Sequence, residues 1–232
     1  MPDSALRRSA LSHTGFMCAH YRIVQGLKEF LALFAIEPED VPAPPPGAEE
    51  GLPSKPVAAV LRDPASNKLR LEYPRWGLLP SWMAETPGRK LLHARAETVA
   101  EKPAYREAFR KRRCILPIAS FFEFDRTSRY LISMEDHSTM GVAGIWERQE
   151  QGLFTCSMIT TASNELVGAY LDRMPAILKP DNYLTWLDPA TREPELHTML
   201  QTRPSKGMKS DFDGLKASYA RLAETGQQEL LF

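Results

Sequence analysis

The strongest nucleophiles in the 232-residue chain are its three cysteines, Cys18, Cys114 and Cys156. Their number is odd, their spacing is wide, and no close cysteine or histidine partner stands at the spacing of metal ligands. We therefore expect three reduced thiols, with no disulfide framework, no metal site and no cofactor. Free cysteine is among the most buried residue types, so only the surrounding sequence can identify a thiol that does chemistry.

Charged residues give the chain no overall preference for a partner. It carries 29 basic and 29 acidic residues, so its total charge attracts neither nucleic acid nor an anionic membrane. Any nucleic-acid site must be a local cluster, such as the basic run at 110–113, which is equally the basic end expected of a helix carrying Tyr105 and Phe109. No apolar run approaches the roughly 20 residues that cross a bilayer, and we expect a cytoplasmic protein with no membrane partner.

The rest of the sequence predicts one α+β domain. A chain of this length can bury a single sizeable core. Apolar residues at helical spacing predict a helix over 25–36, and seven prolines between residues 37 and 56 predict an exposed connection. Short strands are expected at 57–62, 69–73, 113–117, 129–134, 141–145 and 154–160, with helices near Ser163 and after Pro180. Strands without regular helical crossovers are typical of an α+β fold.

Four segments between Met17 and Leu178 resemble, in order, the motifs of a known family. They are Met17-Cys18 with His20-Tyr21, then 74–82, then 93–98 with 113–117 and 121–124, and finally 160–162 with 172–178. On these motifs the chain resembles the SRAP (SOS response-associated peptidase) family, as a divergent bacterial or phage-type member. The resemblance implies a single SRAP-like domain over 17–232, with mixed, mainly antiparallel, barrel-like sheets and flanking helices.

The activity implied by the resemblance is the covalent capture of abasic sites in single-stranded DNA by an N-terminal cysteine. The ring-opened abasic site is an aldehyde, and the cysteine, here Cys18, offers an amine and a thiol on adjacent carbons. The amine forms a Schiff base and the thiol then closes a thiazolidine ring, so the second attack is intramolecular. An α-amine has a pKa of about 8, which leaves a useful fraction unprotonated near neutral pH.

The resemblance also implies roles for other side chains. Glu123 is the expected general acid and base of imine formation, although taken alone it would be a surface carboxylate of a strand. Guanidinium groups bind phosphate oxygens, and tryptophans stack on bases, for which core packing is the alternative. The expected DNA-binding residues are Arg95, Arg173, Trp82, Trp76, His20 and Arg113.

Three positions depart from the family pattern. The family histidine that precedes Asp-Arg-Met-Pro, implicated in proton transfer and in reversal of the crosslink, is Leu171 here, so release of the adduct should be slow. The family asparagine before Ala-Arg is His93, and the arginine of the opening motif is His20. Because histidine changes charge near neutral pH, His93 is a candidate catalytic residue, with a structural hydrogen-bonding role as the alternative.

Cys18 is not the first residue, and an internal cysteine has no free amine. Either translation begins at Met17, whose removal exposes Cys18, or residues 1–17 are cleaved off, and self-cleavage is the peptidase activity proposed for the family. We expect residues 1–16 to be a disordered leader or the product of a misplaced start, and we favour the misplaced start. Two other functions stay open: a non-covalent single-stranded DNA-binding module, and a thiol hydrolase that uses Cys18 with His93.

The end of the chain, 226–232, is a possible tail. Gln228, Leu231 and Phe232 match three positions of bacterial sliding-clamp binding peptides, whose terminal apolar residues enter a preformed pocket. The alternative is that Leu231 and Phe232 pack onto the domain as part of its core. A sliding clamp is therefore a candidate partner besides abasic single-stranded DNA.

Overall fold

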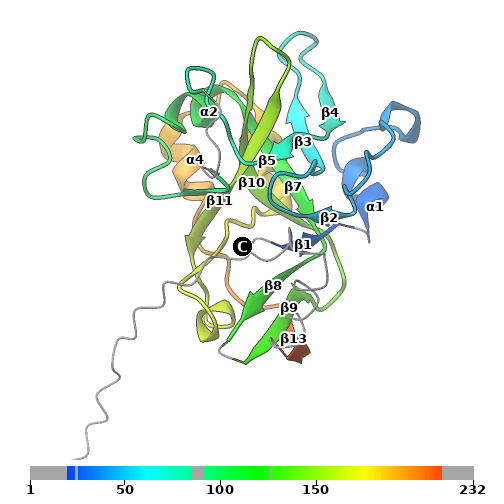
Figure 1. Ribbon diagram of the computed structural model, residues 1–232, viewed down its shortest axis with the longest axis vertical. Coiled ribbons are helices and arrows are strands. Elements are labelled where there is room, and N and C mark those ends of the chain that lie inside the picture. Colours follow the sequence, from blue (N-terminus) through cyan, green and yellow to red (C-terminus); the bar gives the residue numbers. More distant parts are fainter. Residues whose placement is uncertain (1–19, 24–25, 85–90, 126, 216–232) are drawn as a thin grey trace, which may run out of the picture.

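Two β-sheets form the body of the protein (Figure 1). The computed structural model describes residues 20–23, 26–84, 91–125 and 127–215. The strands are β1 Tyr21–Arg22, β2 Glu50–Gly51, β3 Ala59–Arg62, β4 Leu69–Glu72, β5 Arg75–Trp76, β6 His93–Arg95, β7 Arg113–Ile118, β8 Ser120–Phe124, β9 Ser128–Met134, β10 Met140–Arg148, β11 Phe154–Ala162, β12 Arg173–Pro175 and β13 Met208–Leu215. The helices are α1 Leu27–Ala32, α2 Arg106–Lys111, α3 Tyr183–Leu187 and α4 Glu193–Met199, with 3₁₀ turns η1 Pro38–Asp40, η2 Val167–Ala169 and η3 Pro180–Asn182.

The strand order separates a smaller sheet from a larger one. The five-stranded sheet has the order β13-β9-β8-β1-β2. The eight-stranded sheet has the order β12-β11-β10-β7-β3-β4, with β5 and β6 paired to β11. Among the strand pairs that the structure describes, β5 and β6 alone run parallel to their partner, and the remaining pairs are antiparallel.

Strands β7 and β8 join the two sheets, because Ala119 alone separates them. β7 pairs with β3 and β10 in the larger sheet, and β8 pairs with β1 and β9 in the smaller one. In Figure 1, β1 and β2 lie between the group β8, β9 and β13 and the strands of the larger sheet. A side chain of β8 is therefore held at the junction of the two sheets.

The core lies around β7, β10 and β11, whose residues are buried along almost their whole length. Such strands have nearly continuous apolar runs, because both of their faces are covered. Helices cover one face: the indole of Trp186 in α3 donates a hydrogen bond to the carbonyl of Cys114 at 2.9 Å, and its ring lies 6.0 Å from that of Phe109 in α2. Close packing also requires glycine at position 144, where a Cβ would lie 2.8 Å from the Sγ of Cys114.

The structure confirms the α+β class and the six expected strands. Each strand differs from its predicted limits by one to three residues at one or both ends. Two expectations are wrong. Barrel-like closure is absent from the described residues, where each sheet is an open series of strands. The helix expected near Ser163 is a 3₁₀ turn, η2, because the side chain of Asn164 accepts the amide proton of Val167 at 3.0 Å and stabilises a tight turn in its place.

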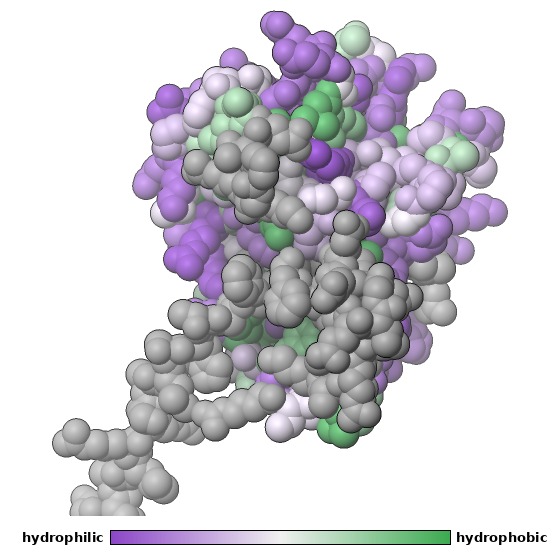
Figure 2. Space-filling view, viewed as in Figure 1, coloured by the Kyte–Doolittle hydropathy of each residue, from purple (hydrophilic) through white to green (hydrophobic). Residues whose placement is uncertain are grey.

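The described part of the chain has a largely hydrophilic surface in the view of Figure 2, where hydrophobic residues form only small separate areas. Within the described ranges, no helix has both the length and the apolar character needed to cross a membrane. The expected leader 1–16, Cys18, and the tail residues Gln228, Leu231 and Phe232 lie outside the described residues.

Candidate functional site

Glu123 is a buried carboxyl group in the middle of the protein. It lies in β8 opposite Tyr130 of β9, and only 2% of it is exposed. Its Oε1 atom has no hydrogen-bond partner among the described residues, and burial raises the pKa of the carboxyl group to about 8. The alternative of a surface carboxylate is therefore wrong. At neutral pH the group is mostly protonated and can donate a proton, as a general acid must.

Strand β1 lies directly beside Glu123. Tyr21 pairs with Phe121, and the amide of Phe122 donates to the carbonyl of His20 at 3.2 Å. The imidazole of His20 lies 4.4 Å from the Phe122 ring and 3.1 Å from a carboxylate oxygen of Glu50. Burial lowers the pKa of His20, against the opposing effect of Glu50, so the imidazole is mainly neutral at pH 7.

A row of aromatic rings connects β1 to His93. The rings of Tyr21 and Trp76 are 5.2 Å apart, and those of Trp76 and His93 are 5.5 Å apart, both edge to face. Trp76 is fully buried, and its indole donates to the carbonyl of Leu92 at 2.9 Å, while the hydroxyl of Tyr105 donates to the carbonyl of His93 at 3.1 Å. The structure thus places Trp76 in the core, where it holds His93 and cannot stack on a base.

Arg95 and Arg173 lie on either side of β11. Arg95 is exposed in β6 and pairs with Thr160, and Arg173 in β12 reaches the same residue, donating to its carbonyl at 2.7 Å. Arg173 also donates two hydrogen bonds to the carboxylate of Glu97, at 2.6 and 2.9 Å, and these bonds lower the pKa of Glu97. The Glu97 carboxylate therefore occupies the pair of Arg173 N–H donors that a phosphate would otherwise bind. Glu97 belongs to the 93–98 motif, but the sequence alone predicts no role for it.

Trp82 is the most exposed large apolar side chain in the described part of the protein, at 65%. Its loop is anchored on both sides: the amide of Leu79 donates to the hydroxyl of Thr155 at 3.0 Å, and the side-chain amide of Gln149 donates to the carbonyls of Pro80 and Met83 at 3.4 Å. A large ring held on the surface by a fixed loop loses little freedom when a base stacks on it. The geometry therefore suits the DNA-stacking role expected of Trp82.

Arg113 has a structural position instead of a surface one. It is 4% exposed, and its guanidinium donates to the carbonyls of Phe109, Arg110, Trp186 and Asp188 at 2.5–2.7 Å. Burial lowers the pKa of Arg113 to about 10, so it stays charged at neutral pH. Because these four bonds tie α2 and α3 to β7, the side chain is not available to a DNA phosphate.

The Arg113→Met variant should lower the free energy of unfolding by about 3–5 kcal/mol, because it leaves four carbonyls without their donor, and the bonds to Phe109 and Trp186 are buried. Urea unfolding at pH 7 measures the change. The control is Arg110→Met, since the Arg110 side chain is 53% exposed and makes only long ion pairs, at 3.5 and 3.9 Å. That variant should change stability by less than about 0.5 kcal/mol. Equal unfolding midpoints for the two variants would contradict the structural role.

Cys114 and Cys156 are fully buried and reduced in the structure, and burial raises the pKa of both thiols. Neither is a nucleophile at neutral pH, because the reactive form of cysteine is the thiolate. The described ranges contain no group of three or more histidine, cysteine or acidic side chains able to hold a metal ion. Of the thiols, only Cys18 is left as a candidate for chemistry, and it precedes His20 by two residues.

In sequence, the chain is similar to a known family and to proteins of Bacillus subtilis. A model of the SOS response associated peptidase (SRAP) family matches residues 17–211. Abasic site processing protein YoqW of Bacillus subtilis (strain 168) is 36% identical over 169 residues, which cover 68% of this chain and 75% of that protein. Abasic site processing protein YoaM of the same organism is 38% identical over 153 residues, covering 62% and 66%.

Solved structures share the fold. A protein from Bordetella bronchiseptica superposes with a TM-score of 0.72 at 22% identity, covering 84% of this chain and 99% of that one. A protein from Bacteroides thetaiotaomicron superposes with a TM-score of 0.69 at 24% identity, covering 84% and 91%. At these identities the likeness extends to the fold alone.

Proposed function

This chain belongs to the SRAP family, and on that premise we propose that it captures abasic sites in single-stranded DNA covalently, through the amine and thiol of Cys18. Relatives at 36% and 38% identity are named abasic site processing proteins. The family match begins at Met17, directly before Cys18, which supports a functional chain that starts at the cysteine after removal of residues 1–17. A start at Met17 followed by methionine removal gives this chain directly, and in a protein translated from Met1 self-cleavage before Cys18 is the proposed peptidase step.

The observation that carries the proposal is the burial of Glu123 beside β1, with its Oε1 atom unpartnered among the described residues. His20 lies against Phe122, the neighbour of Glu123, and two residues of chain span at most about 7 Å. The proposal requires Cys18, two residues before His20 in the sequence, to approach this carboxyl group. A carboxyl group that keeps its proton at pH 7 supplies the acid that imine formation requires.

The proposed chemistry uses one carboxyl group twice. The Cys18 amine adds to the C1 aldehyde of the ring-opened sugar to give a carbinolamine, and Glu123 protonates its hydroxyl, which leaves as water. The thiol then attacks the iminium carbon, forms the C–S bond, and returns its proton to the Glu123 carboxylate. One water molecule is lost overall, and the product is a thiazolidine. We assign proton transfer to His93, which is half-buried in β6, because Leu171 stands at the position of the family histidine.

Trp82 and Arg95, both exposed, are the proposed contacts for a base and a phosphate of the bound strand. Arg173 joins them if a phosphate displaces the Glu97 carboxylate from its guanidinium, since both ligands use the same bidentate geometry. The proposed path thus follows the ends of β6, β11 and β12. His20, which is paired with Glu50, is the proposed DNA contact nearest to Cys18 in the sequence.

The Cys18→Ser variant tests the proposal on a single-stranded oligonucleotide with one abasic site, and both the variant and the parent are prepared as chains that begin at residue 18. The variant should form no adduct that survives denaturing electrophoresis, because serine cannot close the thiazolidine, but it should bind intact single-stranded DNA with an affinity within about twofold of the parent. If neither protein forms an adduct and both bind DNA, the non-covalent module is favoured. If the parent instead hydrolyses a peptide in a Cys18-dependent reaction without forming an adduct, the thiol hydrolase is favoured.

A further inference from the structure

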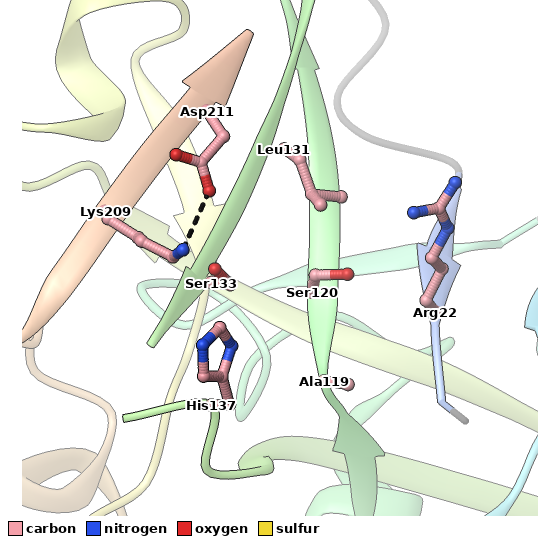
Figure 3. A pocket seen from close by; sticks show the side chains of 8 residues that line it. All are labelled: Arg22, Ala119, Ser120, Leu131, Ser133, His137, Lys209 and Asp211. Carbon is pink, nitrogen blue, oxygen red and sulfur yellow. Dashed lines mark ion pairs between the residues drawn. The ribbon is translucent and has the colours of Figure 1, made fainter. Parts of the chain in front are cut away.

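A polar pocket of about 350 Å³ opens on one face of the five-stranded sheet (Figure 3). Ser120, which lines it, stands three residues before Glu123 in β8. Side chains alternate between the faces of a strand, so the pocket and Glu123 lie on opposite faces. The pocket is therefore separate from the proposed capture site.

Four lining residues form one row across four strands. Arg22 of β1 pairs with Ser120 of β8, Ser120 pairs with Ser133 of β9, and Ser133 pairs with Lys209 of β13. Neighbouring strands lie about 5 Å apart, so the four side chains project side by side from one face. Figure 3 shows Arg22 and Lys209 on opposite sides of the pocket with the two serines between them. Two cations thus flank two hydroxyl groups.

The two serines are hydrogen-bond donors without partners. Ser120 is 6% exposed and Ser133 is 7% exposed, and neither hydroxyl makes a hydrogen bond to any residue that the structure describes. Neither hydroxyl oxygen is among the buried polar atoms that lack a partner, so both are open to the pocket, where a ligand can replace water as their acceptor. Both line the pocket, so a ligand with acceptor oxygens would satisfy them together.

The charge around the serines favours an anion. The Arg22 guanidinium lies 5.0 Å from the centre of the Phe122 ring, and within the described ranges it has no carboxylate at ion-pair distance. Lys209 is paired with the Asp211 carboxylate at 3.1 Å. Arg22, Lys209 and Asp211 together carry one net positive charge. A single oxyanion therefore suits the site better than a cation does.

We propose that this pocket binds the phosphate group of a nucleotide unit, as a second site beyond the proposed capture of abasic DNA. Arg22 offers a planar fork for two phosphate oxygens, the Ser120 and Ser133 hydroxyls donate to the others, and Lys209 closes the far side. The volume exceeds the need of a phosphate alone, and Leu131 and Ala119 give an apolar wall for the attached sugar. The unit is either a backbone phosphate of DNA or a free nucleotide.

Calorimetric titration of the full chain with inorganic phosphate and with thymidine 5′-monophosphate tests the site. Arg22→Ala should weaken both by at least tenfold, since charge-assisted hydrogen bonds contribute about 1.5–3 kcal/mol each, and Ser133→Ala should weaken both by several-fold. The control Arg70→Ala removes an exposed arginine of β4, outside the pocket, and should change neither. No phosphate binding by the parent, or equal binding by the parent and Arg22→Ala, would overturn the proposal. Arg22→Lys replaces Arg22→Ala if the latter does not fold.

Fluorescence anisotropy with an intact single-stranded oligonucleotide identifies the source of the phosphate. A DNA backbone phosphate predicts that Arg22→Ala weakens oligonucleotide binding and reduces the slope of its salt dependence by about one. A free nucleotide predicts loss of thymidine 5′-monophosphate binding with unchanged oligonucleotide binding. Adduct formation at saturating DNA should be unaltered in Arg22→Ala, so failure of this site and failure of the capture chemistry give different results.

Discussion

Protein that begins at Cys18 should form an adduct with abasic single-stranded DNA that survives heat and denaturant, whereas protein that keeps residues 1–17 should form none. The thiazolidine needs an amine and a thiol on one residue, and an internal Cys18 has its nitrogen in a peptide bond. The amide nitrogen cannot condense with an aldehyde. The adduct yield of the form that keeps residues 1–17 should therefore lie below the detection limit. The increase in mass should equal the DNA mass minus one water.

The decisive comparison uses one preparation divided in two. A protease site placed directly before Cys18 allows the same molecules to be assayed with residues 1–17 attached and after their removal. Matching circular dichroism spectra and unfolding midpoints would show that both forms are folded. If the form that keeps residues 1–17 reacts equally well and its mass still includes those residues, then the free amine is not the nucleophile and the proposed mechanism is wrong. If it reacts only after it loses them, self-cleavage is supported.

Sequence patterns predicted the fold class and the strands with continuous apolar runs, such as β10 and β11, because hydrophobic runs are local signals. The two-residue strands β1 and β5 were not predicted. They are too short to show alternation, and their pairing depends on partners far along the chain, Tyr21 on Phe121 and Trp76 on Cys156. Element positions that depend on long-range pairing have no local pattern.

For the candidate site as well, local motifs indicated which residues take part, but not the surroundings that tertiary contacts give them. Motifs indicated Glu123, Arg95 and Arg173, but they could not show that Glu123 is buried, that Glu97 already holds Arg173, or that Trp76 lies in the core. Arg113 is the clearest case. Its place in a basic run suggests a surface, while its four carbonyl acceptors come partly from Trp186 and Asp188, more than 70 residues away. Burial of a charged side chain follows from tertiary contacts that a basic run does not encode.

Glu123→Gln should slow adduct formation by about a hundredfold or more, because general acid and base catalysis commonly contributes factors of 10²–10⁴ and glutamine transfers no proton. The rate for the parent should have a bell-shaped pH profile. It rises as the α-amine loses its proton, at a pKa of about 8, and falls as Glu123, with its pKa raised to about 8, ionises. The variant should lose the alkaline limb. Single-turnover kinetics from pH 6 to 10 measures both effects.

The same substitution should stabilise the protein at alkaline pH. Burial raises the pKa of Glu123 to about 8, above the ordinary value of about 4.3. In the unfolded chain the carboxyl group ionises first, so the stability it provides is complete below pH about 4, declines as pH rises, and is lost once pH passes the folded pKa of about 8. Glutamine has no such loss, so Glu123→Gln should exceed the parent in unfolding free energy at pH 9 by a few kcal/mol and by much less at pH 5.

The matched control is Glu147→Gln, which changes another buried glutamate, 5% exposed, on β10. Its carboxylate accepts a hydrogen bond from Arg112 at 2.6 Å, so its replacement should lower stability and leave adduct formation unchanged. Burial raises the pKa of Glu147 as well, so the effect on rate, and not the pH dependence of stability, distinguishes Glu123 from Glu147. A structural glutamate at position 123 would behave like Glu147, and loss of stability at pH 9 without loss of rate would refute its role as the acid. A slower reaction in a more stable protein is the result expected of a catalytic carboxyl group whose burial disfavours its charge.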